Sequence, residues 1–283
     1  MLRLIVVSGR SGSGKSTALS VLEDAGFNCI DNLPAILLRP LVEETLYSSH
    51  SNETGLAICI DARNNSLNKF TELFDEIDRT KINCELVFFD ALDETLLKRF
   101  SETQRPHPLT NKNRDLQEAI KLETKFLDKV SEKADLRIDT SALTERELRN
   151  LIVDRIIQKR AKTLNLAFCS FGYKHGVPKD ADYVFDMRCL PNPFWSKTLK
   201  NLTGLDEEVK SFLSEQDLVK EMMQDLTFYL GKWINRFENH NKLYMTVAIG
   251  CTGGQHRSVY VVEKLAEYFT EKSMDVIVRH REL

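Results

Sequence analysis

The chain has 283 residues, which exceeds the usual size of one hydrophobic core, so its length predicts two domains. Its 42% apolar and 29% charged residues are the balance of an ordinary folded protein, and the net charge of -3 argues against a globally basic nucleic-acid binder. Any RNA site must therefore be a local patch.

The six cysteines include no Cys-x-x-Cys pair, which favours buried thiols over a zinc site or a disulfide framework. No apolar run is long enough to span a bilayer, and the first residues lead into a glycine-rich loop rather than a signal peptide. These observations predict a cytoplasmic protein that does not contact a membrane.

In the first half, short apolar runs alternate with amphipathic stretches, which indicates a parallel sheet covered by helices. The predicted strands are Leu2–Ser8, Phe27–Ile30, Leu56–Ile60, Glu85–Phe89 and Leu136–Ile138. The predicted helices are Lys15–Ala25, Ala35–Tyr47, Asn68–Arg79, Glu94–Glu102, Asp115–Lys133 and Thr144–Lys162. The stretch 104–133, interrupted by prolines, has the position and polarity of a lid.

The pattern then restarts, which predicts a domain boundary near residue 160 and two domains, 1–160 and 161–283. The predicted strands of the second domain are Leu166–Phe171, Tyr183–Asp186, Tyr244–Ile249 and Asp275–Arg279. Its predicted helices are Asp217–Asn239 and Val259–Glu271. Strands again alternate with helices, so this half is also predicted to be α/β.

Residues 9–16 match the phosphate-binding pattern G-x-x-x-x-G-K-[ST] in full, between a predicted strand and a predicted helix. The loop consists of Gly9, Arg10, Ser11, Gly12, Ser13, Gly14, Lys15 and Ser16. Glycines let successive N–H groups point at phosphate oxygens, Lys15 would contact the β- and γ-phosphates, and the Ser16 hydroxyl would ligate Mg²⁺. The loop therefore predicts a nucleoside triphosphate site that takes Mg²⁺ with ATP or GTP, whereas no catalytic base can be identified.

Two aspartates follow apolar strands, at the edge where ligands bind to such sheets. Asp90 precedes a predicted helix, and we interpret it as a helix N-cap. Asp61 has three open interpretations: a helix cap, a magnesium contact through water, or an acceptor for a guanine edge. The following Arg63 and Asn64 place a guanidinium and an amide beside it.

A second glycine-bearing loop, 250–258, also lies between a predicted strand and a predicted helix. Its glycines, hydroxyls, histidine and arginine form a second candidate anion cradle, to which His175 and Arg188 could contribute. Cys251 and Arg257 also have the C-x5-R spacing of cysteine-dependent phosphatases. The predicted fold is thus α/β, with an N-terminal P-loop kinase-like parallel sheet and a second α/β domain that carries its own phosphate-binding loop.

Together these motifs resemble the RapZ/YvcJ family of bacterial nucleotide-binding proteins, some of which act as RNase adapters. The resemblance extends over essentially the whole chain. It rests on the segments Gly9–Ser16, Asp31–Pro34, Asp61–Asn64, Ser170–Gly176, Asp186–Arg188, Leu190–Pro193 and Gly250–Ser258. A large superfamily shares the first segment, whereas the last two together are far more specific.

The resemblance implies binding and weak hydrolysis of ATP and GTP, with guanine nucleotide assigned to Asp61, Ala62, Arg63 and Asn64. It also implies a C-terminal domain that binds small regulatory RNA, recruits RNase E and senses glucosamine-6-phosphate in amino-sugar control. The residues expected to hold the aminosugar phosphate are His175, Arg188, Thr252, Gly253, Gly254, His256, Arg257 and Ser258. The residues expected to contact RNA are Lys264, Lys272, Arg279, His280 and Arg281, in a homo-oligomer.

The chain departs from adapter members at several positions. Gln255 stands where they carry a lysine, Phe194 stands where they carry a histidine, and the last stretch reaches Leu283 without their basic extension. The segment 105–107 also has fewer basic residues than the corresponding lid of the family. RNA binding would therefore depend on the basic residues that are present.

Two other functions remain open on the sequence. A small-molecule P-loop kinase fits Asp31, which follows the second predicted strand at the position where nucleoside monophosphate and shikimate-type kinases hold the acceptor. A cysteine phosphatase fits the spacing of Cys251 and Arg257, although Gly250 stands where those enzymes usually have a histidine. The expected main role is regulatory binding, with weak triphosphatase activity at most.

Overall fold

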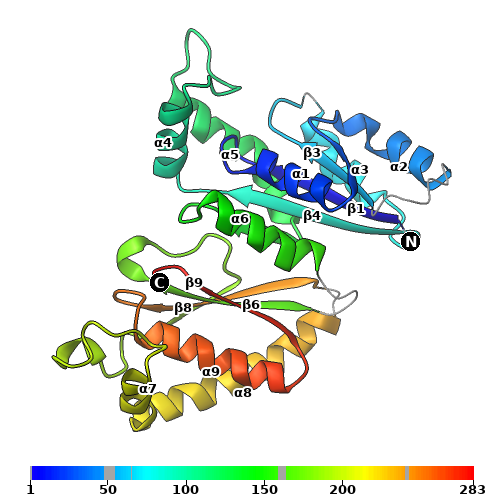
Figure 1. Cartoon of the computed structure of the whole chain (residues 1–283). Helices are drawn as coiled ribbons and strands as arrows, with labels where there is room; N and C mark the ends of the chain where they lie inside the picture. Colours follow the sequence, from blue (N-terminus) through cyan, green and yellow to red (C-terminus); the bar gives the residue numbers. More distant parts are fainter. Residues whose placement is uncertain (1, 48–54, 65, 159–163, 240–241) are drawn as a thin grey trace. The chain divides into compact units, whose positions relative to one another are not determined.

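The computed structural model describes residues 2–47, 55–64, 66–158, 164–239 and 242–283. The chain divides into two compact units, Met1–Gln158 and Lys159–Leu283, each built around its own parallel sheet (Figure 1). This confirms the predicted α/β class. Within the described ranges, no helix is long and apolar enough to cross a bilayer.

The N-terminal unit has a five-stranded sheet in the order β2-β3-β1-β4-β5, with every neighbouring pair parallel. The strands are β1 (Leu2–Gly9), β2 (Phe27–Ile30), β3 (Gly55–Ile60), β4 (Ile82–Asp90) and β5 (Leu136–Asp139). The helices are α1 (Lys15–Asp24), α2 (Leu38–Tyr47), α3 (Phe70–Asp75), α4 (Asp93–Thr103), α5 (Leu116–Lys133) and α6 (Glu145–Ile152). The order places the carboxyl ends of β1 and β3 side by side, so the loop after β1 lies beside Asp61.

Two helices differ most from the predicted ranges. α3 is shorter than the predicted helix Asn68–Arg79, because the Asp78 carboxylate accepts the Thr80 backbone N–H at 3.0 Å and forms a turn there. α6 continues into a π-helical turn, Val153–Ile157. Residues 159–162 of the predicted helix Thr144–Lys162 lie outside the described residues.

The predicted lid over 104–133 is wrong for most of its length. α5 is part of the core, because Ile120, Leu127 and Val130 on one face of this helix are buried. A capping box between Asp115 and Glu118 fixes the helix start. Only the loop 104–115 remains outside a helix, and its His107 is also buried.

The C-terminal unit has a four-stranded parallel sheet in the order β7-β8-β6-β9. The strands are β6 (Asn165–Gly172), β7 (Tyr183–Asp186), β8 (Tyr244–Cys251) and β9 (Asp275–His280). The helices are α7 (Glu207–Ser214), α8 (Asp217–Asn239) and α9 (Arg257–Glu271). In the register of the sheet, Gly172 is opposite Cys251 and Asp186 is opposite Gly250. The segments that follow β6, β7 and β8 therefore leave from one edge of the sheet.

The sequence did not predict α7. It is a helix of eight residues, and its signals were the helical spacing of Val209, Phe212 and Leu213 and the acidic Glu207 and Glu208 in its first turn. Val209 and Leu213 anchor it in the core of the C-terminal unit.

Candidate functional site

The glycine-rich loop joins β1 to α1 and has the backbone that the motif requires. Gly9, Gly12 and Gly14 have φ values of 141°, 81° and 104°, which favour glycine. A Cβ on Gly9 would also lie 2.1 Å from the carbonyl oxygen of Phe89. Lys15 Nζ donates hydrogen bonds to the carbonyl oxygens of Gly9 (2.8 Å) and Arg10 (3.0 Å). The ammonium group therefore lies over the loop, where it can meet a phosphate.

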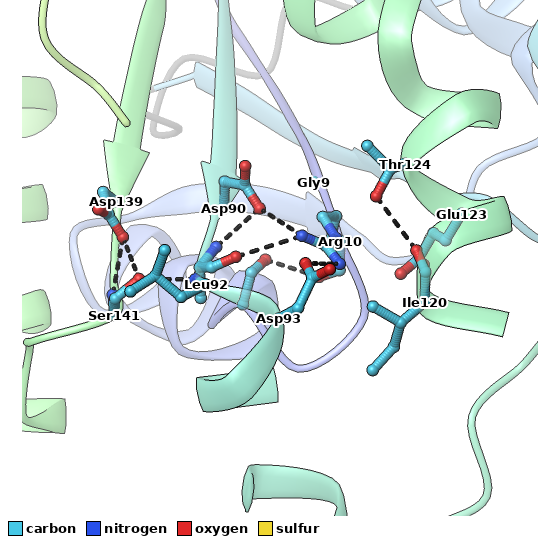
Figure 2. A network of polar contacts seen from close by, with 12 residues as sticks. Gly9, Arg10, Asp90, Leu92, Asp93, Ile120, Glu123, Thr124, Asp139 and Ser141 are labelled. Atoms are coloured by element: carbon cyan, nitrogen blue, oxygen red, sulfur yellow. Dashed lines mark hydrogen bonds and ion pairs between the residues drawn. The ribbon is translucent and has the colours of Figure 1, made fainter. Parts of the chain in front are cut away.

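The Arg10 side chain points away from this loop, although the sequence placed Arg10 in the nucleotide site. Its guanidinium is buried and lies 3.3 Å from Asp90 and 2.7 Å from Asp93, with a further hydrogen bond to the carbonyl oxygen of Ala91 (Figure 2). The predicted helix cap at Asp90 is wrong, because Leu92 holds the N-cap position of α4. Asp90 instead fixes the base of the loop through Arg10.

A buried glutamate of α5 holds another part of the loop. The Glu123 carboxylate accepts the Ser11 N–H (3.0 Å) and hydroxyl (2.7 Å), and lies 3.1 Å from Nε2 of His107. The His107 Nδ1 accepts the Leu109 N–H, so the ring proton is on Nε2 and points at Glu123. Burial raises the pKa of Glu123, but the hydrogen bonds from His107 and Ser11 and the charge of Lys15 outweigh it, so the pKa lies below its usual value.

The two nucleotide motifs of the N-terminal unit meet in one cavity of about 620 Å³. Lys15 and Ser16 line it together with Asp31, Asp61 and Arg63. Ala62 and Asn64, which the sequence also assigned to guanine nucleotide, do not line it. Ala62 packs in the core, and the Asn64 amide donates to the carbonyl oxygen of Leu33 at 2.8 Å.

Arg99 also lines this cavity, and the sequence analysis missed it. It donates to the carbonyl oxygen of Gly12 (3.0 Å) and to Thr140 Oγ1 (2.9 Å), so it ties α4 to the loop. Burial lowers the pKa of its guanidinium. The sequence did carry a signal for Glu123, because it interrupts the apolar stripe of Ile120, Leu127 and Val130 on α5.

Asp61 is buried at the wall of the cavity. Its Oδ2 accepts from Arg63 Nε (2.8 Å) and Nη2 (2.6 Å), and its Oδ1 accepts the Arg63 backbone N–H. Burial raises its pKa, but these hydrogen bonds and the charges of Lys15 and Arg63 bring the net pKa below 3.8. The negative charge of Asp61 and the positive charge of Lys15 thus line the same cavity.

The lowered pKa of Asp61 predicts a pH dependence. The carboxylate stabilises the folded state above the unfolded pKa of 3.8, and this stability is lost as the pH falls toward the lower folded-state value. We expect Asp61→Asn to cost about 1 kcal/mol at pH 7 and less below pH 4, as measured by urea unfolding, because Arg63 is half-exposed. Asp128→Asn, an exposed site on α5, is the control. Parallel stability curves for Asp61→Asn and the parent would contradict the assignment.

The second loop, 251–257, joins β8 to α9 around a buried thiol. Cys251 Sγ accepts the Gly254 N–H at 3.2 Å and lies 3.1 Å from the Ser258 hydroxyl. Gly254 has a φ of 79°, and a Cβ on it would lie 2.3 Å from the Glu282 carboxylate and 2.7 Å from the Gly172 nitrogen. The Cys251 side chain is 2% exposed and held on two sides, which disfavours a role as an open nucleophile.

Arg257 connects this loop to the segment after β7. Its Nη1 donates to the carbonyl oxygens of Arg188 and Leu190, both at 3.0 Å, and its Nη2 donates to Thr252 Oγ1 at 3.2 Å. Its Nε is buried without a hydrogen-bond partner among the described residues. An anion bound beside the exposed Thr252 could accept a hydrogen bond from the Arg257 guanidinium.

The histidines predicted for the second cradle lie apart from each other. His256 is buried, and its Nε2 lies 3.2 Å from the carbonyl oxygen of Leu199. His175 is exposed in the turn that follows β6. Arg188 forms a bidentate pair with Asp186 and lies 3.9 Å above the Tyr173 ring. The structure therefore brings together Thr252, Arg257 and the Arg188 backbone, while the His256 ring is used inside the core.

The basic residues predicted to contact RNA fall into two groups. At the end of β9, Arg279 pairs with Asp180, and Arg281 donates to the carbonyl oxygen of Gly176. His280 lies between the Ser170 hydroxyl (2.8 Å) and the Glu263 carboxylate (2.9 Å). The other two, Lys264 and Lys272, lie on or directly after α9. Arg279, His280 and Arg281 therefore each have a partner within the unit, and RNA contact by the five residues stays a prediction.

Comparison with known proteins covers both units. Residues 2–160 match the RapZ-like N-terminal domain, and residues 164–283 match the RapZ C-terminal domain. A "Nucleotide-binding protein" of Azotobacter vinelandii is 51% identical over 284 residues, covering 100% of both chains. A "Nucleotide-binding protein in ptsN-ptsO intergenic region" of Stutzerimonas stutzeri is also 51% identical, again over 100% of both chains.

Among solved structures, a shikimate kinase from Acinetobacter baumannii in complex with shikimate is similar at 18% identity, with a TM-score of 0.37 over 57% of this chain and 96% of that chain. The domain matches account for nearly every residue, and the two relatives extend over the whole chain. These matches confirm the resemblance found in the sequence, and the chain therefore belongs to the RapZ family.

Proposed function

We propose that this protein binds ATP or GTP in its N-terminal unit and acts as an RNase adapter through its C-terminal unit. The observation that carries the proposal is the presence of two phosphate-type cradles, each at the carboxyl edge of a separate parallel sheet. The first surrounds Lys15 and the second surrounds Thr252 and Arg257. Two cradles in one chain suit a protein in which one ligand regulates the use of another.

In the first cradle, the phosphates would lie on the loop amides and Lys15. The Ser16 hydroxyl is exposed at the start of α1, where it fits a ligand of Mg²⁺, and Asp61 in the same cavity could reach the ion through water. Mg²⁺ would neutralise charge on the phosphates and favour their slow hydrolysis. The relatives named as nucleotide-binding proteins support this assignment.

In the second cradle, we propose glucosamine-6-phosphate as the ligand. Its phosphate would lie at the start of α9 near Thr252 and the unpaired Arg257 Nε. The same unit would bind a small regulatory RNA and present it to RNase E. Binding of the aminosugar phosphate at the edge where β6, β7 and β8 end would then control RNA binding in amino-sugar regulation.

A thermal-shift experiment on the full chain separates the two ligand sites. We expect ATP or GTP with Mg²⁺, and separately glucosamine-6-phosphate, to raise the melting temperature of the parent, because a ligand that binds the folded state stabilises it. Lys15→Ala should abolish the nucleotide shift and leave the sugar phosphate shift unchanged. Lys98→Ala, an exposed lysine of α4, is the matched control. A nucleotide shift of normal size in Lys15→Ala would refute the first site.

The adapter role has its own test. We expect a small regulatory RNA of the aminosugar circuit to be retained by the parent in a gel shift at physiological salt. Absence of retention by a normally folded protein would remove the adapter role and leave nucleotide binding untouched.

A small-molecule kinase is the second candidate, because Asp31 and Arg63 line the same cavity as Lys15. In such a kinase, an acceptor hydroxyl would attack the γ-phosphorus, the bond to the β-phosphate oxygen would break, and a carboxylate would take the hydroxyl proton. An acceptor screen with labelled ATP tests this function. Release of free phosphate alone, without a labelled acceptor, would argue against it.

A further inference from the structure

Two cavities of the C-terminal unit form one continuous track between α8 and α9. Their volumes are about 520 Å³ and 330 Å³, and Thr227 and Tyr268 line both. Lys220 and Lys264 line one end, whereas Lys232 and Lys272 line the other. The residue numbers rise together on both helices, so α8 and α9 run in the same direction, as they do side by side in Figure 1.

The track is basic although the chain has a net charge of -3. Among the residues that the structure describes, four lysines line the two cavities and no aspartate or glutamate does. Lys220 forms a surface ion pair with Asp217, and Lys264 forms one with Glu267. Because surface ion pairs contribute little to stability, a phosphate can replace the carboxylate at little cost in free energy. In the described part of the chain, Lys232 and Lys272 have no carboxylate within salt-bridge distance.

Aromatic rings lie between the two lysine pairs. Phe228 is 75% exposed and lines the track at the middle of α8. Lys272 lies 4.6 Å above the Tyr268 ring, which places a positive charge beside a stacking surface. Lys220 and Lys232 are about 18 Å apart along the helix axis, at about 1.5 Å per residue. Cations at this separation can contact an elongated polyanion, and the exposed phenyl ring between them can stack on a flat ring of the same ligand.

We propose that this track, lined by Lys220, Phe228, Lys232, Lys264, Tyr268 and Lys272, binds a single-stranded segment of RNA. The phosphates lie along the lysine pairs and a base stacks on Phe228, which is the combination used by single-strand binding grooves. This inference rests on the RNA-binding part of the proposed function. It moves the main RNA contacts from the end of β9 to α8 and α9.

Two features favour RNA over an acidic helix of a partner protein. Helix-in-groove binding uses a continuous apolar stripe, whereas Thr227 and Asn235 interrupt the apolar residues on the α8 side of this track. The cations at the end of β9 are already committed inside the unit: Arg279 to Asp180, and His280 to Ser170 and Glu263. The lysines of the track are the more accessible phosphate contacts.

The test measures binding of the full chain to a fluorescein-labelled single-stranded RNA 12-mer by anisotropy between 50 and 200 mM salt. For the double variant K232A/K272A we expect weaker binding and a log–log salt slope shallower by about 1.4, since each contact to single-stranded RNA contributes about 0.7. For Phe228→Ala we expect binding weaker by about 5- to 160-fold with an unchanged slope, because a stacked base is lost but no phosphate contact. The matched control is K125A/K129A, two exposed lysines of α5.

The outcomes separate this inference from the adapter role. If the parent binds the 12-mer and the track variants behave like K125A/K129A, RNA binding stands and the track is wrong. If the parent fails to bind the 12-mer but retains the small regulatory RNA in the gel shift, the track is wrong and the adapter role stands. If the parent binds neither RNA, both are wrong. If the track lysines are needed for binding a glutamate-rich amphipathic peptide and not for binding RNA, the track serves a protein partner and the inference is overturned. All substituted track residues are exposed, so melting temperatures should stay within a degree or two of the parent's.

Discussion

Replacing Glu123 with alanine is expected to lower the free energy of unfolding by about 3–5 kcal/mol. Glu123 is fully buried and satisfies the Ser11 N–H, the Ser11 hydroxyl and the His107 ring proton at once. Alanine would leave these donors buried without an acceptor, and each loss costs about 1–3 kcal/mol. Urea unfolding of the parent and Glu123→Ala measures the difference.

The control for this prediction is Glu132→Ala, an exposed glutamate on the same helix, for which we expect a change below about 0.5 kcal/mol. The stability of Glu123→Gln should lie between those of Glu123→Ala and Glu132→Ala. The amide oxygen of glutamine can still accept a hydrogen bond, whereas its NH₂ group would face the donors of Ser11 or His107. Equal stabilities of Glu123→Ala and Glu132→Ala would show that Glu123 does not hold the loop.

The consequence for nucleotide binding is separate from the stability loss. Ser11 lies within the phosphate-binding loop, and Glu123 links it to His107 in the segment that lines the cavity through Arg105 and Pro108. The carboxylate therefore couples the loop to the cavity rim. Addition of ATP should recover less stability in Glu123→Ala than in the parent, because the loop must be ordered when the phosphates bind.

Features of local sequence were predictable, and contacts across the chain were not. The strands and the loop at 9–16 follow from apolar runs and glycine spacing, which are readable within a short window. The sequence also placed Asp61 at the ligand edge of the sheet, because it follows an apolar strand. That Asp61 lies in the same cavity as Lys15 depends on β1 and β3 being neighbours, which the structure shows.

The side chains of Arg10 and His256 show where prediction from local sequence fails. Both lie inside phosphate-binding motifs, yet Arg10 turns toward Asp90 and Asp93, and His256 turns toward the carbonyl oxygen of Leu199. Their partners are 57 or more residues away in the sequence. A motif fixes the backbone, whereas the direction of each side chain depends on distant groups that compete for its donors.

Arg257 carries the second large expected effect. Arg257→Ala should lower the free energy of unfolding by about 3–6 kcal/mol, because the buried guanidinium donates to the carbonyl oxygens of Arg188 and Leu190 and each such bond contributes about 1.5–3 kcal/mol. It should also abolish the thermal shift with glucosamine-6-phosphate, since the Thr252 contact and the local positive charge are lost. Urea unfolding and the thermal-shift assay measure the two effects.

Two variants separate the structural role of Arg257 from its role in binding. Arg188→Ala removes an exposed guanidinium but keeps the backbone carbonyl that Arg257 holds, so it should leave the urea midpoint close to the parent's and weaken only ligand binding. Arg257→Lys keeps the charge. The lysine ammonium lacks the planar guanidinium, so it cannot donate to both carbonyl oxygens and Thr252 at once. We expect faster amide hydrogen exchange in 186–192 for Arg257→Lys and for Arg257→Ala, but not for Arg188→Ala. Unchanged exchange in both Arg257 variants would mean that the guanidinium does not hold this segment, and the cradle would then be formed by the loop 251–257 alone.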